Sequence, residues 1–305
     1  MAPNGKKAGT VTFVGRPNAG KSTLMNLLLG EKVAIVSNKP QTTRHRLVGI
    51  LSDERGQMVF HDTPGIHKPL HRLNRQMIRH ALDAMSDTDV LCLLVDVSER
   101  TGAGDAYMLD LVGKAEGSKR VLILNKVDRV KKPDLLPRMA HYSETRLFEE
   151  IVPVSAKTGD NCDRLLDVLW NLLPEGEPIY DPELLTIHPE RFLVAERIRE
   201  KVLELTSEEL PFSTAVAIER WEDDEEKNLI RIYATILVER EGQKKIVVGR
   251  QGDMIKNIGT AARIDLEEFL ERRVYLELFV RVEPGWREDR SVLATLDRDV
   301  DVETD

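Results

Sequence analysis

The chain has 305 residues, 41% of them hydrophobic and 31% charged, which is typical of a globular protein with two domains. Its net charge of −8 excludes nucleic-acid binding through overall charge, so any such surface must be a local basic patch. Two cysteines are too few for a disulfide framework, and neither a signal peptide nor a bilayer-spanning run is apparent, so we expect a cytoplasmic protein.

The first motif is the glycine-rich segment Gly15–Ser22, which follows the apolar run Val11–Val14 and precedes a helical pattern, Thr23–Leu29. We interpret it as a phosphate-binding P-loop, because glycines let backbone N–H groups turn toward a phosphate and the helix N-terminus favours an anion. Lys21 should reach the β- and γ-phosphates, and the Ser22 hydroxyl should bind Mg²⁺. An ordinary glycine turn is the alternative. The expected nucleotide contacts here are Gly15, Asn18, Ala19, Gly20, Lys21, Ser22 and Thr23.

Short apolar runs alternate with amphipathic stretches up to Leu173, which predicts an α/β domain with a mostly parallel six-stranded sheet. The gap between the second and third strands is too short for a crossover helix, so these two should form an antiparallel hairpin. Ligands of such sheets lie at the carboxyl ends of the strands. The expected strands are Val11–Val14, Arg46–Leu51, Met58–His61, Val90–Val95, Val121–Leu124 and Ile151–Pro153.

Polar motifs follow the third and fifth of these strands. In Asp62–Gly65, the carboxylate can hold Mg²⁺ and the Gly65 N–H can sense a γ-phosphate. In Asn125–Asp128, the Asp128 carboxylate can pair with N1–H and the exocyclic amine of guanine, while the Lys126 stem lies along the base. Each motif alone is a common turn, but their order along the sheet indicates a guanine-nucleotide site.

The sixth strand precedes Ser155–Lys157, where the backbone N–H of Ala156 could contact guanine O6 and where Ser155 and Lys157 complete the expected contacts. Together the motifs resemble the G domain of GTPases over about residues 8–173. The resemblance implies a Mg²⁺-binding threonine before Arg44, for which Thr43 is the first choice and Thr42 the second. The expected Mg²⁺ ligands are therefore Ser22, Asp62 and Thr43 or Thr42.

Two segments, 32–45 and 63–75, are expected to be mobile switches. Ile66 stands where many GTPases place a water-orienting glutamine, so hydrolysis should be slow without stimulation or should use another group. In the GTPases that share this apolar residue, a P-loop asparagine can help to hold K⁺, and we hypothesise this role for Asn18; ordering of the loop by local hydrogen bonds is the alternative. The expected catalytic residues are Lys21, Thr43, Gly65 and Asn18.

Pro174–Pro182 breaks both helix and strand, so residues 174–188 should link the G domain to a second domain, 189–290. We expect residues 1–7 to be flexible and the acidic tail, 291–305, to be disordered. The second domain should contain a helix (189–205), strands at 213–221, 229–238 and 244–248, a helix from 253 to about 273, and a last strand (274–282).

The segment Gly249–Gly252 is the second functional signal. Its two glycines permit close approach of a sugar-phosphate backbone, and the next helix favours an anion at its N-terminus. Bases could then lie in an apolar groove formed by residues such as Ile246, Val248, Met254, Ile255 and Ile258. A structural turn is the alternative. With its element order, the domain resembles a type II KH domain of the α+β class, and the expected RNA contacts are Lys244, Lys245, Gly249, Arg250, Gln251, Gly252 and Lys256.

The combination resembles the Era family of GTPases over roughly residues 8–290, also through the segments 189–192, 231–235 and 279–287. The resemblance implies a cytoplasmic GTPase that uses GTP/GDP and Mg²⁺, binds the 3′ end of small-subunit (16S) ribosomal RNA rather than DNA, and assists assembly of the 30S subunit. It also implies peripheral association with the inner face of the cell membrane. The alternatives are an RNA chaperone with GTP as a structural ligand, and a GTPase of tRNA modification or membrane traffic.

Overall fold

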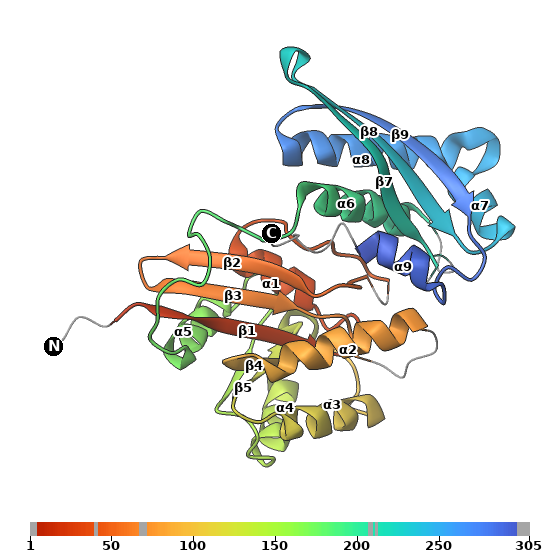
Figure 1. Cartoon of the computed structure of the whole chain (residues 1–305). Coiled ribbons are helices and arrows are strands. Elements are labelled where there is room, and N and C mark those ends of the chain that lie inside the picture. Colours follow the sequence, from red (N-terminus) through yellow and green to blue (C-terminus); the bar gives the residue numbers. More distant parts are fainter. Residues whose placement is uncertain (1–4, 40–41, 67–71, 207–209, 211–212, 298–305) are drawn as a thin grey trace. The chain divides into compact units, whose positions relative to one another are not determined.

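The computed structural model describes residues 5–39, 42–66, 72–206, 210 and 213–297. They divide into two compact units (Figure 1), each described here by itself. The first unit holds the described residues of 1–34, 43–70 and 74–187, and the second those of 35–42, 71–73 and 188–305. Two short segments from the first half of the chain therefore belong to the second unit.

A six-stranded sheet forms the centre of the first unit, with strand order β2-β3-β1-β4-β5-β6. Every neighbouring pair is parallel except β2 and β3, which form the predicted antiparallel hairpin. The predicted fold class is confirmed, although most strands are longer than expected. Their bounds are β1 (Lys7–Gly15), β2 (Leu47–Asp53), β3 (Gly56–Asp62), β4 (Val90–Asp96), β5 (Lys119–Asn125) and β6 (Glu150–Pro153).

Helices cover this sheet and bury its apolar strands. One cluster joins Val14 of β1 and Leu93 of β4 to side chains of α2, α3 and α4, such as Met85 and Met108. Because the strands are buried along nearly their whole length, they read as continuous apolar runs. The helices are α1 (Lys21–Leu29), α2 (Arg72–Ser86), α3 (Ala103–Lys114), α4 (Lys132–Ser143) and α5 (Cys162–Leu172).

The segment after α5 is hydrogen-bonded along the edge of the sheet. The Ile50 N–H donates to the Leu185 carbonyl at 2.8 Å, and the Thr186 hydroxyl donates to the Val48 carbonyl at 2.6 Å. The buried amide of Gln57 donates to the carbonyl of Tyr180 and accepts from its N–H, both at 2.8 Å. The predicted linker is therefore fixed to the first unit through most of its length.

The second unit is a three-stranded sheet with helices on one face. Its strand order is β7-β8-β9, with β7 and β8 antiparallel and β8 and β9 parallel. Val194 and Ile198 of α6 and Leu266 of α8 pack on Ile232 of β8 in one buried core. The elements are α6 (Glu190–Leu205), β7 (Ala215–Asp224), β8 (Leu229–Val238), α7 (Glu241–Val248), α8 (Asp253–Leu270), β9 (Arg273–Val282) and α9 (Arg290–Asp297).

The prediction of a strand at 244–248 is wrong, because these residues lie in α7. The side chain of Gln243 accepts from the backbone N–H groups of Glu239 and Arg240 at 2.8 and 3.0 Å, which caps the start of a helix. Val247 alone in this helix is fully buried. The β-branched run at the end of the helix resembled a strand, but the cap and the tertiary packing decide its conformation.

The expectation of a disordered tail is also wrong for residues 291–297, which lie in α9. The Asp289 carboxylate accepts from the backbone N–H of Ser291 at 2.8 Å and caps the helix, and Leu293 is buried. Residues 298–305 lie outside the described part of the chain. A short amphipathic helix within an acidic segment was therefore missed.

Candidate nucleotide and RNA sites

The P-loop is shaped by Gly20, the residue before α1. Its backbone has a φ of +99°, and a Cβ atom built there would collide with the side-chain nitrogen of Asn125. That nitrogen donates to the carbonyl oxygen of Ala19 at 2.8 Å. Only glycine therefore fits at this position, and Asn125 fixes the loop from the end of β5.

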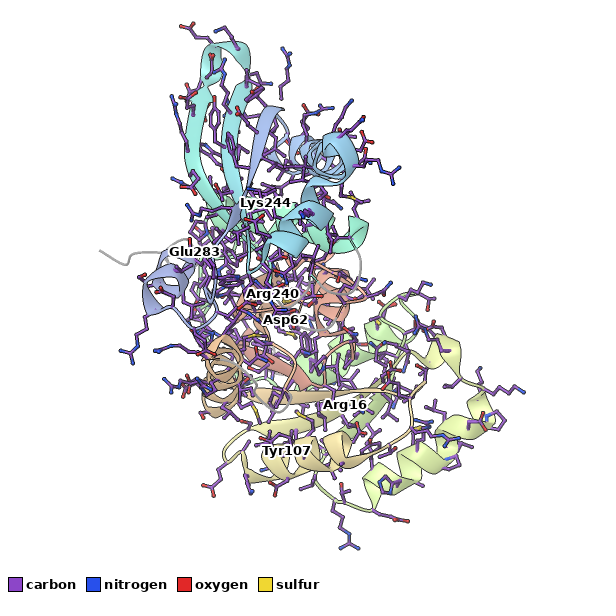
Figure 2. The ribbon with its side chains drawn as sticks, turned by 90° about the vertical axis from the view of Figure 1, so that its right-hand side faces the viewer. Arg16, Asp62, Tyr107, Arg240, Lys244 and Glu283 are labelled. Atoms are coloured by element: carbon purple, nitrogen blue, oxygen red, sulfur yellow. The ribbon has the colours of Figure 1, made fainter. Side chains whose placement is uncertain are left out.

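Three oxygen-bearing side chains converge beside this loop. The Ser22 hydroxyl donates to Oδ2 of Asp62 at 2.5 Å, and the Thr43 hydroxyl lies 2.9 Å from that of Ser22 and 3.3 Å from the same carboxylate oxygen. Asp62, labelled in Figure 2, is fully buried at the end of β3, and its Oδ1 has no hydrogen-bond partner within the described residues. Oxygen ligands and a buried, unpaired carboxylate oxygen fit a Mg²⁺ ion.

Burial also shifts the pKa values of the two charged residues beside this loop, Lys21 and Asp62. Burial lowers the pKa of Lys21 from its ordinary value, and the nearby Asp62 carboxylate only partly opposes this shift. Burial raises the pKa of Asp62, against the effects of Lys21 and of the Ser22 and Thr43 hydrogen bonds. A bound phosphate beside Lys21 and a cation beside Asp62 would relieve both costs. The electrostatics thus favour a Mg²⁺–phosphate ligand.

The two candidate threonines are placed differently. The Thr42 hydroxyl donates to the Lys39 carbonyl at 2.7 Å and lies 3.0 Å from the Ser37 hydroxyl. It is therefore engaged within its own loop, so of the two choices only Thr43 joins Ser22 and Asp62. Residues 40–41 and 67–71 of the expected switches lie outside the described residues.

Gly65 and Ile66 lie against the start of the P-loop. The Ile66 N–H donates to the Gly15 carbonyl at 3.1 Å, and a Cβ on Gly65 would come within 2.7 Å of Pro17. The Ile66 side chain is buried in the core cluster that contains Val14 and Leu93. The residue in the glutamine position therefore packs in the core and offers no polar atom to water.

The expected base-binding residues meet at the ends of β5 and β6. The Ser155 hydroxyl donates to the Asp128 carboxylate at 2.6 Å and orients this exposed side chain. The Ala156 N–H, which the sequence assigned to guanine O6, donates to Oδ1 of Asn125 at 2.9 Å. The Asn125 side chain lies between the P-loop and the loop after β6, and its oxygen accepts the hydrogen bond from the Ala156 N–H in this structure. Lys157 follows in the same turn.

Sequence reasoning missed Asp96, which ends β4. Its carboxylate lies 2.6 Å from the Lys126 ammonium, which also donates to the Asn18 carbonyl at 2.7 Å. Burial raises the pKa of Asp96, but hydrogen bonds from Lys126 and Ser98 outweigh this effect and hold the pKa below its ordinary value. The sequence signal that could have identified Asp96 is an acidic residue at the carboxyl end of a strand, where the ligands of parallel sheets bind. Asp96 therefore fixes Lys126 against the P-loop.

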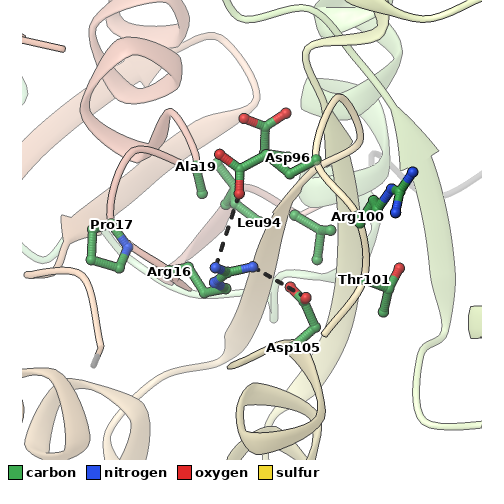
Figure 3. A pocket seen from close by; sticks show the side chains of 10 residues that line it. Arg16, Pro17, Ala19, Leu94, Asp96, Arg100, Thr101 and Asp105 are labelled. Atoms are coloured by element: carbon green, nitrogen blue, oxygen red, sulfur yellow. Dashed lines mark hydrogen bonds and ion pairs between the residues drawn. The ribbon is translucent and has the colours of Figure 1, made fainter. Parts of the chain in front are cut away.

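A pocket borders the P-loop on the side of α3 (Figure 3). Within it, the Arg16 guanidinium donates to the Asp105 carboxylate at 3.2 Å and lies 3.9 Å from that of Glu99. The arginine of the P-loop is therefore engaged by acidic residues of this pocket. The lining residues are Arg16, Pro17, Ala19, Leu94, Val95, Asp96, Glu99, Arg100, Thr101 and Asp105.

In the second unit, the segment Gly249–Gly252 connects α7 and α8. Gly249 has a φ of +75°, and a Cβ there would lie 2.5 Å from that of Met254, so glycine is required for the close turn. At Gly252 a Cβ would meet nothing within 4 Å. Arg250 and Gln251 are exposed. The loop therefore offers an accessible backbone at the start of α8.

Basic side chains gather around this loop. Lys244, labelled in Figure 2, lies on α7 together with Lys245, and Lys256 is exposed on the first turns of α8. Arg263, further along α8, pairs with Glu267 at 2.7 Å. Ile258 is fully buried and cannot line an open groove, whereas the other apolar residues expected there are partly exposed: Ile246, Val248, Met254 and Ile255.

Comparisons with known proteins agree with this division. A family model described as a 50S ribosome-binding GTPase matches residues 10–126, and a KH domain model matches residues 209–287. The chain is 47% identical over 287 residues to the GTPase Era of Syntrophus aciditrophicus, covering 94% of each chain. It is 45% identical over 297 residues to the GTPase Era of Geobacter metallireducens, covering 97% of this chain and 99% of the relative.

Solved structures extend the likeness to three dimensions. An Era variant from Aquifex aeolicus bound to GDP·AlF₄⁻ matches with a TM-score of 0.92 and 38% identity, covering 95% of this chain and 98% of the other. Era in complex with MgGDPNP and nucleotides 1506–1542 of 16S ribosomal RNA matches with a TM-score of 0.92 and 37% identity, over the same 95% and 98%. The matched regions therefore include residues of both units.

Proposed function

This chain belongs to the Era family of GTPases, and from that premise we propose a switch that hydrolyses GTP, binds the 3′ end of 16S ribosomal RNA and assists assembly of the 30S subunit. The observation that carries the nucleotide part is the convergence of Ser22, Thr43 and Asp62 beside a P-loop with a buried lysine. A related Era binds MgGDPNP and this RNA region together, which supports the combination.

In the reaction, water attacks the γ-phosphorus, the bond from that phosphorus to the β–γ bridging oxygen breaks, and GDP and phosphate leave. Ser22, Thr43 and, through water, Asp62 would hold Mg²⁺, which when bound withdraws charge from the phosphate oxygens. Lys21 would balance charge on the β- and γ-phosphates, and the Gly65 N–H would donate to the γ-phosphate. Asp128, oriented by Ser155, would select guanine.

Potassium stimulation by Asn18 is the finer part of this proposal. Ile66 is buried and supplies no polar atom, so water and developing charge need another partner. Asn18 lies exposed in the P-loop with a φ of +62°, and its carbonyl holds Lys126. Turnover should be faster in K⁺ than in Na⁺ at matched ionic strength, and Asn18→Ala should remove the difference. Equal rates in both salts would contradict the role.

RNA binding is assigned to the loop between α7 and α8. Its accessible backbone can clamp a sugar-phosphate chain, with affinity from the basic residues Lys244, Lys245, Arg250 and Lys256 through counterion release. The RNA expected is the single-stranded 3′ end, by analogy with the bound fragment of the related Era.

The decisive experiment measures both GTP hydrolysis and RNA affinity. Lys21→Ala should abolish turnover, and the wild-type chain should bind a 16S 3′-end oligonucleotide more tightly with a non-hydrolysable GTP analogue than with GDP. RNA affinity that does not depend on the nucleotide would favour the chaperone alternative. Crosslinking in cells then maps the contacted nucleotides.

Cytoplasmic location and peripheral association with the inner face of the cell membrane complete the proposal, on the strength of family membership. Within the described residues, no helix is long and apolar enough to cross a bilayer. Flotation of the full chain with vesicles of anionic lipid, in GTP and in GDP, tests the peripheral association. If the protein floats with the vesicles in neither state, the peripheral association is contradicted.

A further inference from the structure

The nucleotide-binding motifs account for two of the contacts that hold the P-loop. Lys126 donates to the Asn18 carbonyl, and Asn125 donates to the Ala19 carbonyl. Arg16, the second residue of the loop, is held instead by α3 and the segment before it, which lie outside those motifs (Figure 3). The loop therefore has a third attachment, within the first unit, that no motif marks.

Arg16 connects the expected phosphate site to α3. Its backbone carbonyl accepts from the Ala19 N–H at 3.3 Å and from the Lys21 ammonium at 3.4 Å, so its backbone forms part of the loop. Its guanidinium donates to the Asp105 carboxylate at 3.2 Å and lies 3.9 Å from that of Glu99. A displacement of this side chain would therefore also disturb a carbonyl that contacts Lys21.

Asp105 is well suited to hold the guanidinium in one place. Its side chain is only 7% exposed. The carboxylate oxygen that accepts from Arg16, Oδ2, also accepts from the Gly102 N–H at 2.8 Å, and this second bond caps the start of α3. A carboxylate anchored in this way has little freedom to rotate, and a buried one is costly to leave without a charged partner.

Gly104 leaves the space that the Arg16 side chain occupies. It lies in the first turn of α3, and its φ is outside the left-handed region, so the helix itself does not require glycine there. A Cβ atom at this position would lie 2.9 Å from Nε and 3.2 Å from Cδ of Arg16. Even an alanine would therefore displace the arginine from its place beside Asp105.

We propose that Asp105 is a positioning residue for nucleotide binding, which acts through Arg16 to keep the P-loop in the conformation that receives the phosphates of GDP and GTP. The inference rests on the proposed function, because it needs the loop and Lys21 to hold those phosphates. A P-loop contacts the α- and β-phosphates, which both nucleotides carry. Loss of the attachment should therefore weaken GDP and GTP equally, unlike loss of a group that responds to the γ-phosphate alone.

Asp105→Asn tests the charge. The asparagine oxygen can still accept from the Gly102 N–H, so the cap of α3 is retained while the attraction to the guanidinium is lost. The Arg16 side chain is 40% exposed, so the ion pair should be of moderate strength. In the full chain, the Kd for GDP and the KM for GTP should each rise by about fivefold, with less than about a twofold change in kcat.

Asp110→Asn is the control for this substitution. Asp110 lies on the same helix and is also ion-paired, but with Lys114, at 2.6 Å. This variant should keep the wild-type Kd for GDP and KM for GTP. An equal loss in Asp110→Asn and Asp105→Asn would overturn the inference, because it would indicate a general effect of charge on α3.

Gly104→Ala tests the position of Arg16 without changing any charge. Alanine is the better helix former, so the variant should be about as stable as the wild type in urea unfolding. Its Kd for GDP should rise by about as much as that of Asp105→Asn, because the methyl group displaces Arg16. Gly113→Ala makes the same change in the same helix, where the added Cβ meets only Leu147, at 3.7 Å, and it should bind GDP normally.

A double variant and Lys21→Ala complete the test. Arg16→Met/Asp105→Asn should lose no more GDP affinity than Arg16→Met alone, and losses that add would contradict action through Arg16. Wild-type or tighter GDP binding in Asp105→Asn or in Gly104→Ala would also overturn the inference. If Lys21→Ala still loses turnover in that case, the proposed function stands; normal turnover in Lys21→Ala would instead contradict the proposed function itself.

Discussion

The side chain of Asn125 joins the phosphate loop to the base-binding loop: its nitrogen donates to the Ala19 carbonyl at 2.8 Å, across 106 positions of sequence. Its oxygen accepts from the Ala156 N–H at 2.9 Å. One buried amide therefore sets the distance between the part of the site that holds phosphate and the part that holds guanine. Loss of either bond should weaken binding of GDP and GTP alike.

Asn125→Asp tests the first of these bonds. The substitution keeps an acceptor for the Ala156 N–H but replaces the donor to Ala19 with a second oxygen. A buried carbonyl that loses its donor costs about 1–3 kcal/mol, so we expect about a 10- to 100-fold loss of affinity for both nucleotides. Fluorescent GDP titration measures it.

Gln57→Glu is the matched control for Asn125→Asp. Gln57 is likewise a buried amide that donates to a backbone carbonyl and accepts from backbone N–H groups, but its partners are Ile179 and Tyr180. This variant should be less stable and should bind GDP normally. Equal affinity losses in the two variants would show that global destabilisation is responsible.

Gly20→Ala should abolish nucleotide binding. The added methyl group would collide with the Asn125 side chain, and the φ of +99° disfavours any residue with a Cβ. Gly30→Ala has nearly the same backbone cost, at a φ of +74°, but its Cβ meets nothing within 4 Å. Gly30→Ala should therefore lose about 1 kcal/mol of stability and keep its GDP affinity, measured by denaturant unfolding and titration. Retained binding in Gly20→Ala would contradict the loop geometry.

His61 should make the protein less stable as the pH falls. Burial, with a smaller effect of the Arg46 charge, lowers the pKa of His61 from 6.5 to about 4. The unfolded chain therefore takes up a proton near pH 6.5, while the folded chain does not until the pH approaches 4. This difference should cost about 2 kcal/mol of unfolding free energy between pH 7 and pH 5. In urea unfolding at a series of pH values, the unfolding free energy of His61→Gln should fall less steeply with decreasing pH than that of the wild type. The same dependence on pH in both proteins would contradict the buried neutral histidine.

Gly252→Asp should weaken RNA binding while GTP turnover continues. The added side chain has open space, so the unit should fold, but it places a negative charge where a phosphate is expected to bind. We expect an affinity loss of about tenfold or more for the 16S 3′-end oligonucleotide. Gly285→Asp is the control, since its φ is +71° and it too has no neighbour within 4 Å. Similar losses in both variants would argue against the loop as the RNA site.

Much of the nucleotide site could be predicted because its chemistry is local. Ser22 and Asp62 are recognisable from a short motif or a strand end, and the parallel sheet then brings the strand ends together. The contact between Arg16 and Asp105 joins positions 89 apart in sequence, and no local pattern marks it. The helix at 241–248 was missed for a related reason, since the core contact of Val247 and the cap by Gln243 outweigh a β-branched run.

Because the segment after α5 is hydrogen-bonded along β2, it leaves little free length in the chain before the second unit begins at His188. Thr186 is tied to Val48, Ile187 packs against the cluster of Val48, Ile50 and Val59, and His188 already stacks with Phe192 at 5.0 Å. The chain then enters the second unit at His188, directly after Ile187, so the predicted fifteen-residue linker adds little free length at this crossing. Glycines inserted between Ile187 and His188 would lengthen this crossing without breaking any of these contacts.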